Sequence, residues 1–276
     1  MQLIVAGKNR LAVEGLSLAL QHFKPAQVGV IVGEVSLVEK RNFPVFQQAA
    51  NEYGVRIIEL EEAYLMSEAV FLSLEYDRIL NPELFSSKKL YNLHLSLLPN
   101  YKGVATSAWP IIKGEQHAGT TLHHIDSGID SGDILAQSKF PIPPCETSFG
   151  LHNLLIDSAA ELLTINFESL VSGDLIRIPQ TGQGSYFRRR DLVFADINLS
   201  DFKTCEEIQR WFRALYFPIY QMPRFENHEV SHIKITEYSP GDPPGSWRWS
   251  ECGGEIVVSL PDGTANLKIV EHGNIR

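Results

Sequence analysis

Short apolar runs alternate with amphipathic stretches through the first part of the chain. Residues 2–6, 28–32, 55–60 and 70–74 are rich in valine, leucine and isoleucine, as expected of parallel strands that are buried on both faces of a sheet. Between the first two runs, apolar residues recur at roughly helical spacing over residues 11–20. Strands that alternate with helices predict an α/β fold, with a mostly parallel sheet and helices on both of its faces.

The pattern changes in the second half of the chain. Residues 146–170 carry an apolar stripe at helical spacing, and Gly173 follows as a common helix stop. Another helix is expected over residues 205–215, before a series of strands. We therefore predict a Rossmann-like domain over residues 1–190 and a small C-terminal domain over residues 191–276, in which a helix precedes antiparallel β-strands.

The C-terminal domain is expected to be rich in β-structure. Strands are predicted over residues 233–238, 255–260 and 265–270, and residues 261–264 form a hairpin turn. Three or four strands cannot close a barrel, and exposed sheet edges seek partners. We therefore predict a homodimer that forms through this β-rich module.

The polar positions of the strand predicted at residues 90–94 carry the first candidate chemistry. Asn92 and His94 point to the same side of this strand, about 7 Å apart along the chain. An amide donor beside a titratable imidazole can polarise a carbonyl group and move a proton. Pro99 and Gly103 then turn the chain away, which leaves this edge open to a ligand. A hydrogen-bonded structural pair is the alternative interpretation of the two side chains.

A second candidate lies in the acidic loop at residues 127–133, which follows a strand-like run. Glycines on both sides of Asp130 let the backbone bend sharply and approach a ligand. A carboxylate in this loop can pair with His94 and favour the charged form of the imidazole. Of the flanking acids, Asp126 and Asp133, one is expected to assist and the other to form the turn.

Charge and composition narrow the class of partner. The 276 residues have a formal net charge of -9 and no basic block, which counts against a nucleic-acid partner. The three cysteines are odd in number and widely spaced, so neither a disulfide framework nor a zinc site is predicted. His117, His123 and His124 do not repeat a metal-ligand spacing, and the two in the predicted strand are interpreted as structural. We expect no metal.

The apolar and basic residues near the N-terminus predict a cytoplasmic protein. No apolar run reaches the roughly 18 residues that span a bilayer, so no membrane partner is expected. The basic residues at 8–10 follow the first apolar run, whereas in a signal peptide they precede it.

Taken together, the two motifs resemble the folate-dependent formyltransferases. The first reads N-L-H-L-S-L-L-P-N-Y-K-G at residues 92–103, and the second reads G-T-T-L-H-H-I-D-S-G-I-D-S-G-D-I at residues 119–134. The resemblance implies an enzyme that uses 10-formyltetrahydrofolate as co-substrate, with catalytic residues Asn92, His94 and Asp130. It places this chemistry in the domain at residues 1–190.

The resemblance also implies roles within the site. Asn92 and protonated His94 would stabilise the oxyanion while Asp130 orients the imidazole, and neutral His94 is an alternative general base. The residues expected to bind folate are Leu74, Glu75, Tyr76, Ile125, Asp126 and Asp130. For Tyr76 a half-buried aromatic position at the rim is an equal alternative.

The resemblance is nearest to the sugar-nucleotide N-formyltransferases, and specifically to those that act on dTDP-4-amino-4,6-dideoxyglucose in surface-polysaccharide synthesis. It extends to A-G-K-N at residues 6–9 and T-S-A-W-P at residues 106–110. Leu95 stands where the family often has phenylalanine. A 3-amino sugar nucleotide and methionyl-tRNA are alternative acceptors, and a hydrolase of the formyl carrier or a non-catalytic folate binder is a further alternative.

Binding of the sugar nucleotide is assigned to basic and polar residues from four parts of the chain. The single glycine of residues 6–10 does not make a dinucleotide fingerprint, but this turn follows the first strand and so can border the cleft. Arginines at 188–190 suit a pyrophosphate, with a solvated, acid-paired loop as the alternative. The assigned residues are Lys8, Asn9, Ser96, Tyr101, Lys102, Thr106, Arg188 and Arg190.

Overall fold

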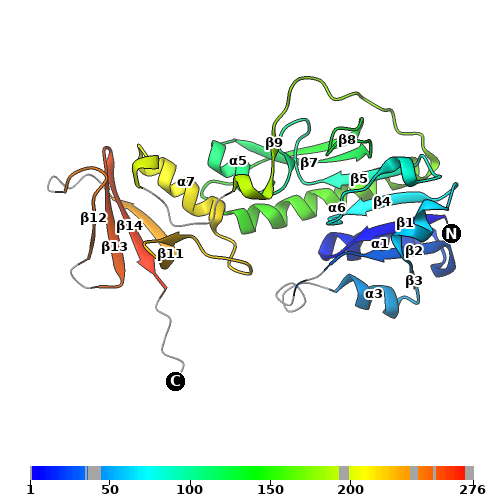
Figure 1. The fold of residues 1–276 in the computed structure, drawn as a ribbon, viewed down its shortest axis with the longest axis horizontal. Helices are drawn as coiled ribbons and strands as arrows, with labels where there is room; N and C mark the ends of the chain where they lie inside the picture. Colours follow the sequence, from blue (N-terminus) through cyan, green and yellow to red (C-terminus); the bar gives the residue numbers. More distant parts are fainter. Residues whose placement is uncertain are drawn as a thin grey trace. The chain divides into compact units, whose positions relative to one another are not determined.

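The computed structural model describes residues 2–34, 36, 45–192, 199–236, 242–250 and 253–270 (Figure 1). Contacts between residues divide the chain into two compact units. The first comprises Met1–Thr106, Gln116–Ile142 and His152–Arg188, and the second comprises Ser107–Glu115, Pro143–Leu151 and Arg189–Arg276. Two short segments from the first half of the chain thus group with the C-terminal residues, and the domain boundary between residues 190 and 191 stays a prediction.

The first unit contains the elements expected from the alternating pattern. In chain order they are β1 (Leu3–Gly7), α1 (Arg10–His22), η1 (Pro25–Gln27), β2 (Val28–Val32), α3 (Phe46–Glu52), β3 (Arg56–Ile57), α4 (Leu60–Tyr64), β4 (Val70–Leu74), η2 (Pro82–Leu84), β5 (Leu90–His94), β6 (Lys102–Gly103), β7 (His117–His124), β8 (Ile134–Pro141), α6 (Ser148–Ser172, whose first turn is grouped with the second unit) and β9 (Tyr186–Phe187).

Within the described residues, the main sheet has the strand order β3-β2-β1-β4-β5-β7-β8. The strands from β3 to β5 are parallel, and β7 and β8 are added as antiparallel strands. Strands β1 and β4 are buried along their whole length, as their apolar sequences predict. The prediction of a mostly parallel sheet is therefore confirmed.

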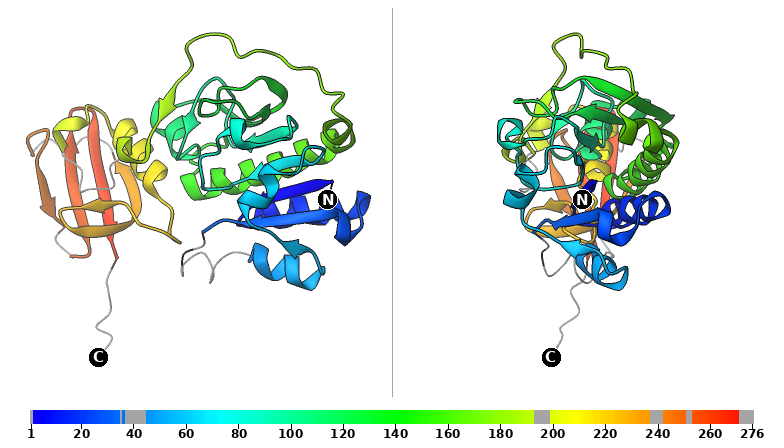
Figure 2. Two further views of the ribbon diagram at one scale, coloured as in Figure 1. Left: turned by 45° about the vertical axis from the view of Figure 1, so that its right-hand side comes forward. Right: turned by 90° about the vertical axis from the view of Figure 1, so that its right-hand side faces the viewer.

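Helices cover both faces of this sheet, which confirms the predicted α/β class. Alternate residues of β1, β2 and β4 form one face, where Ile4, Ala6, Ile31 and Phe71 pack with residues of α4 and with Phe85. On the other face α1 and α6 lie side by side (Figure 2). A side chain at Gly15 of α1 would meet Leu74 of β4, so this glycine allows the helix to approach the sheet closely.

The turn after β5 is fixed by hydrogen bonds from the two antiparallel strands. The Thr121 hydroxyl donates to the carbonyl oxygen of Ser96 at 2.6 Å and accepts from the Leu98 N–H at 3.1 Å. The Gln137 amide donates both to the Leu98 carbonyl oxygen and to the Thr121 hydroxyl. Strands β7 and β8 thus hold the loop that leaves His94.

The second unit contains a helical part and an antiparallel sheet. Its elements are α5 (Ala108–Lys113), η3 (Arg189–Asp191), η4 (Leu199–Asp201), α7 (Cys205–Leu215), β10 (Arg224–Phe225), β11 (His228–Thr236), β12 (Trp247–Trp249), β13 (Glu255–Leu260) and β14 (Gly263–Ile269). The sheet order is β10-β11-β14-β13-β12 among the described residues.

The small sheet curls around its own core, and its antiparallel strands after a helix match the predicted β-rich module. Residues of α7 and of strands β10, β11, β13 and β14 share one buried cluster. The rings of Phe225 in β10 and Trp247 in β12 meet edge to face at 5.8 Å, although these strands are at opposite edges of the sheet. Strand β11 begins five residues before the predicted strand, whose Glu237 and Tyr238 lie outside the described residues.

The packing of β4 gives a test of the first core. Phe71→Ala removes a side chain that is 1% exposed and stacks edge to face on Phe85 at 5.0 Å. We expect the free energy of unfolding, measured with urea, to fall by about 3–5 kcal/mol. The matched control Ile79→Ala removes a side chain that is 84% exposed and should change this free energy by less than about 0.5 kcal/mol. Equal effects of the two changes would contradict the assignment of this core.

Candidate active site

Side chains from β5 and the acidic loop converge as the two motifs predict. Asn92 is half-buried, and its Nδ2 lies 3.4 Å from Oδ1 of Asp130. His94, two residues later on the same strand, is buried and places Nδ1 3.6 Å from the same oxygen. The antiparallel partner strand places His123 directly opposite Asn92. These four side chains form the candidate active site.

The backbone of the acidic loop holds Asp130 in place. Asp130 has a φ of 50°, a left-handed conformation that is uncommon for residues other than glycine. The Gln180 amide donates to the carbonyl oxygens of Asp130 and Gly132, both at 2.8 Å. The Gly103 N–H donates to Oδ2 of Asp130, also at 2.8 Å. Gln180 was not expected from the sequence, and neither was this contact of Gly103.

Gly103 is needed at its position for a second reason. It pairs with Phe187 in the parallel ribbon formed by β6 and β9. Its φ is 90°, and a Cβ atom there would lie 2.1 Å from the carbonyl oxygen of Phe187. The ring of Phe187 also stacks on Tyr101, whose N–H donates to the Ser185 hydroxyl. The segment that leads to Arg188 is thereby joined to the loop that supports Asp130.

The environment of His94 favours the neutral imidazole. Its Nε2 lies 2.9 Å from the carbonyl oxygen of Tyr101, and a carbonyl can only accept, so Nε2 carries a proton. Burial lowers the pKa of His94 below its ordinary value of 6.5, although the charge of Asp130 opposes this shift. In the neutral ring the lone pair is therefore on Nδ1, the nitrogen that faces Asp130.

Asp130 is ionised at neutral pH. Burial alone would raise the pKa of its carboxyl group. The positive charge of protonated His94 and the hydrogen bond from the Gly103 N–H outweigh burial and lower the pKa to about 2. The site therefore combines an anionic carboxylate with a neutral imidazole and an amide donor.

The contact between His123 and Asn92 was not expected from the sequence. The His123 side chain is 2% exposed, with Nδ1 2.9 Å from the carbonyl oxygen of His124 and Nε2 3.0 Å from Nδ2 of Asn92. The second motif contains His123, and the pairing of β5 with β7 puts it opposite Asn92. A single histidine in a predicted strand does not indicate which residue it will contact. His123 was therefore interpreted as a structural residue, and its contact with Asn92 was not predicted.

The residues assigned to folate lie in two places. Leu74 is fully buried at the end of β4, where its side chain packs beside Gly15, so its backbone alone could reach a ligand. Glu75 follows with a φ of 55°, and its Oε1 lies 3.8 Å from Nε2 of His152. Tyr76 packs partly against the core, which matches the alternative of a half-buried aromatic. The folate roles of these residues stay predictions.

The other folate positions border Asp130 in sequence. Ile125 is partly buried against the same core as Tyr76. Asp126 accepts hydrogen bonds from the Gly128 N–H and from the Ser131 hydroxyl, so it forms the turn. This assigns the turn-forming role to one of the two acids that flank Asp130.

The residues assigned to the sugar nucleotide come from several elements and from both units. Lys8 and the buried Asn9 follow β1, and Asn9 is the N-cap of α1. The Ser96 hydroxyl donates to the carbonyl oxygen of Asn100 at 2.8 Å, so it stabilises a turn. Lys102 lies in β6, and Thr106 is half-buried just before α5. Arg188 ends the first unit, whereas Arg190 belongs to the second, and both are exposed.

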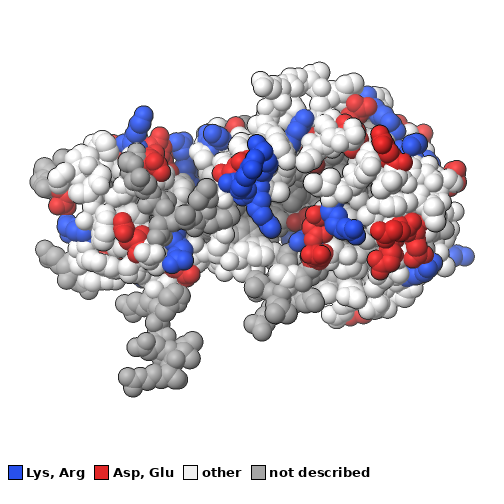
Figure 3. Space-filling view, viewed as in Figure 1, with Lys and Arg blue, Asp and Glu red and all other residues white. Residues whose placement is uncertain are grey.

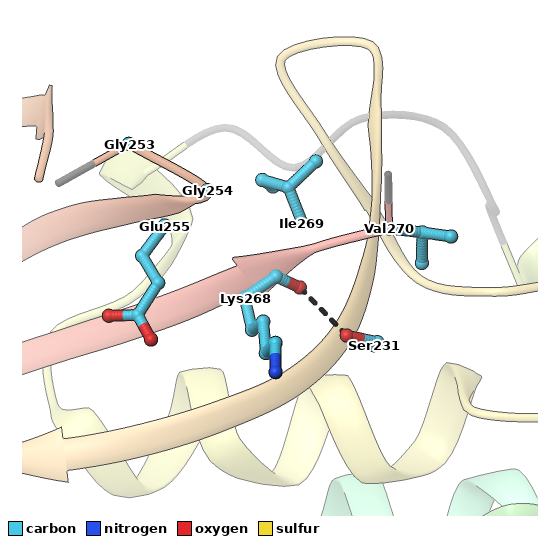
Figure 4. A pocket seen from close by; sticks show the side chains of 7 residues that line it. All are labelled: Ser231, Gly253, Gly254, Glu255, Lys268, Ile269 and Val270. Carbon is cyan, nitrogen blue, oxygen red and sulfur yellow. Dashed lines mark hydrogen bonds between the residues drawn. The ribbon is translucent and has the colours of Figure 1, made fainter. Parts of the chain in front are cut away.

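Neither the surface charge nor the pocket described below supports the assignment of these residues to the sugar nucleotide. Basic and acidic side chains are interspersed over the face drawn in Figure 3. An open pocket at the ends of β11, β13 and β14 is lined by Ser231, Gly253, Gly254, Glu255, Lys268, Ile269 and Val270 (Figure 4). None of the predicted site residues lines it.

The described part of the chain has neither a metal-ligand cluster nor a membrane-spanning helix. It contains no group of three or more His, Cys, Asp or Glu side chains that could hold a metal ion. It also contains no helix with the length and apolar character needed to cross a membrane. Cys145 and Cys205 are free thiols, and Cys252 lies outside the described residues.

Solved structures similar to this chain include N-formyltransferases that act on sugars. An N-formyltransferase from Helicobacter canadensis, in complex with folinic acid and dTDP-3-aminofucose, is 34% identical, with a TM-score of 0.87, and the match covers 98% of this chain and 99% of that one. WlaRD, a sugar 3N-formyltransferase solved with dTDP and 5-N-formyltetrahydrofolate, is 30% identical, with a TM-score of 0.87 and 98% of both chains covered.

Sequence comparisons identify the same family. Residues 34–165 match the model of the formyl transferase family. The methionyl-tRNA formyltransferase of Clostridium beijerinckii is 30% identical over 243 residues, which are 85% of this chain and 76% of that protein. The chain spans only 61%, 52% and 62% of the length of three other curated methionyl-tRNA formyltransferases. On these matches, and with the expected Asn, His and Asp side chains brought together, this chain belongs to the formyl transferase family.

Proposed function

We propose that this protein transfers the formyl group of 10-formyltetrahydrofolate to the amino group of a nucleotide-linked sugar. The observation that carries the proposal is the convergence of an amide donor, a neutral imidazole and a carboxylate at Asn92, His94 and Asp130. The full-length similarity to two sugar N-formyltransferases that were solved with folates supports it.

The three side chains suit a formyl transfer in which the sugar amine attacks the formyl carbon. Asn92 donates a hydrogen bond to the formyl oxygen as negative charge develops there. Nδ1 of His94 accepts the proton that the amine loses. When the bond between the formyl carbon and N10 breaks, N10 takes up the proton held by His94 and tetrahydrofolate leaves. The products are the formamido sugar and tetrahydrofolate, and atoms and charge balance.

The protonation state of His94 decides between the two roles considered for it. A protonated imidazole would act as a second oxyanion donor, and a neutral one would act as a base. Burial lowers the pKa of His94, and its Nε2 hydrogen is already directed at the Tyr101 carbonyl oxygen. Both observations favour the base, with Asp130 stabilising the imidazolium that forms.

The acceptor is proposed to be a dTDP-linked amino sugar. Two similar structures reported above are at least 30% identical to this chain. One contains dTDP-3-aminofucose and the other is a sugar 3N-formyltransferase, so both favour an amine at position 3 of the sugar. The sequence resemblance alone favoured dTDP-4-amino-4,6-dideoxyglucose, which remains the second candidate. Arg188 and Arg190 are exposed and are proposed to bind the pyrophosphate.

The proposed setting is the cytoplasmic synthesis of a surface polysaccharide, where a nucleotide sugar is the substrate. Methionyl-tRNA is the rival acceptor, because the curated relatives reported above act on it by name. The net charge of -9 argues against a tRNA partner. A hydrolase of the formyl carrier is the remaining rival.

A panel of acceptors separates these functions. Purified protein with 10-formyltetrahydrofolate is tested on dTDP-3-amino and dTDP-4-amino sugars and on methionyl-tRNA, beside His94→Ala. We expect transfer to a dTDP-amino sugar, a higher kcat/KM for the 3-amino compound, and a loss of about 10²-fold or more in the variant. Transfer to methionyl-tRNA alone, or release of formate without any acceptor, would refute the proposal.

The pH dependence tests the role of His94. If neutral His94 is the base, kcat/KM should fall as pH drops through its pKa, which lies below 6.5. Asp130 raises the pKa of His94, so Asp130→Asn should move this acid limb to lower pH while also lowering the rate. A limb that moves to higher pH in the variant, or a rate that rises as the imidazole is protonated, would exclude this assignment.

The predicted homodimer is also a proposal, and the edge strand β12 is its proposed surface. All three residues of β12 are exposed, among them Trp249 at 44%. Exposed edge strands pair readily with a second copy. In sedimentation experiments we expect Trp249→Lys to raise the dimer dissociation constant at least about tenfold. The control Ile165→Lys, at an exposed position of α6, should leave it unchanged, and a monomeric parent protein would rule the dimer out.

A further inference from the structure

The side-chain amide of Asn92 is held by a residue outside the proposed catalytic set. Its Nδ2 lies 3.0 Å from Nε2 of His123 and 3.4 Å from Oδ1 of Asp130. His123 comes from the neighbouring antiparallel strand, directly opposite Asn92, and its side chain is almost fully buried. The shorter of the two contacts is therefore the one made with the histidine.

The tautomer of His123 follows from its other nitrogen. Nδ1 lies 2.9 Å from the carbonyl oxygen of His124, which can only accept, so Nδ1 carries the hydrogen. In the neutral ring Nε2 then has a lone pair and accepts from Asn92. A flipped amide would instead direct its oxygen at this lone pair, and two acceptors would face each other.

The orientation of this amide decides whether Asn92 can act. Nδ2 carries two hydrogens, of which one goes to His123 and the other makes only the long contact with Asp130. This second hydrogen is the one left for a formyl oxygen. A rotation by 180° would replace the nitrogen with an oxygen and repel the developing negative charge.

We propose that His123 is a positioning residue whose Nε2 fixes the Asn92 amide with its nitrogen toward the site. The part of this inference that concerns rate rests on the proposed formyl transfer. The part that concerns the two side chains does not, because it is a property of the protein without substrates. The two parts are therefore tested separately.

The first test is the ring nitrogen spectrum of His123 in the substrate-free protein. Long-range ¹⁵N–¹H correlation spectra distinguish a nitrogen that carries hydrogen from one with a lone pair, and loss of the signal in His123→Gln assigns it. We expect Nδ1 protonated and Nε2 unprotonated at neutral pH. A hydrogen on Nε2, directed at the nearby Asp130 carboxylate, would overturn the inference whatever reaction the protein performs.

The second test compares two replacements of His123 in formyl transfer. The amide oxygen of His123→Gln can take the place of Nε2 as an acceptor, whereas His123→Leu has none. We expect His123→Leu to lower kcat at least about tenfold, toward the roughly 10²–10³-fold loss expected for Asn92→Ala. His123→Gln should stay within about fivefold of the parent, with KM for both substrates nearly unchanged in either variant.

Two controls separate positioning from folding. His124→Leu changes the adjacent histidine, whose Nε2 contacts the carbonyl oxygen of Lys88, and should leave kcat within about twofold. In the Asn92→Ala background, His123→Gln and His123→Leu should have no further effect, since His123 acts only through the amide. A full additional loss there would assign its effect to Asp130 or to packing and refute the proposal. If His123→Leu does not fold, the proposal is tested by the ring nitrogen spectrum of His123 and by the kcat of His123→Gln.

Discussion

The carboxylate of Asp130 is the point on which the rest of the site depends. One of its oxygens accepts the Gly103 N–H at 2.8 Å, and the other lies within 3.6 Å of Asn92, His94 and His123. Burial of a carboxylate is costly unless hydrogen bonds and neighbouring charges compensate for the lost water. The Gly103 N–H and the Asn92 amide supply these hydrogen bonds while His94 is neutral, so both groups must stay where they are.

This requirement explains features of the chain that lie well apart in sequence. The left-handed backbone at Asp130 is held by the Gln180 amide, fifty residues away. The N–H of Gly103 is held by its place in β6, whose only partner among the described strands is β9. Strand β9 leads directly into the arginines, and its partner β6 contains the Gly103 N–H that donates to Asp130. The residues proposed to bind the sugar nucleotide and the carboxylate proposed for catalysis are thus held by the same β6–β9 ribbon.

The sequence predicted the elements whose signal is periodic. The buried strands β1 and β4, the long helix α6 and the convergence of Asn92, His94 and Asp130 followed from apolar runs, helical spacing and two motifs. The ribbon of β6 and β9 did not, because two-residue strands have no periodicity and pair across more than eighty residues. Strand β12 was missed because all its residues are exposed, so they do not alternate. His123 was interpreted as structural because its partner becomes visible only once the β5–β7 register is known.

In the proposed reaction, the arrangement of His94 and Asp130 favours the transition state over the resting state. With His94 neutral, its Nδ1 lone pair and an anionic oxygen face each other at 3.6 Å, and neither can donate to the other. In the proposed reaction a proton arrives at Nδ1 as the amine attacks. The same pair then becomes a charge-assisted hydrogen bond, which is stronger than a neutral one. The stabilisation therefore appears as the proton moves and is absent before it, which is the condition for an interaction to accelerate a reaction and not merely to strengthen binding.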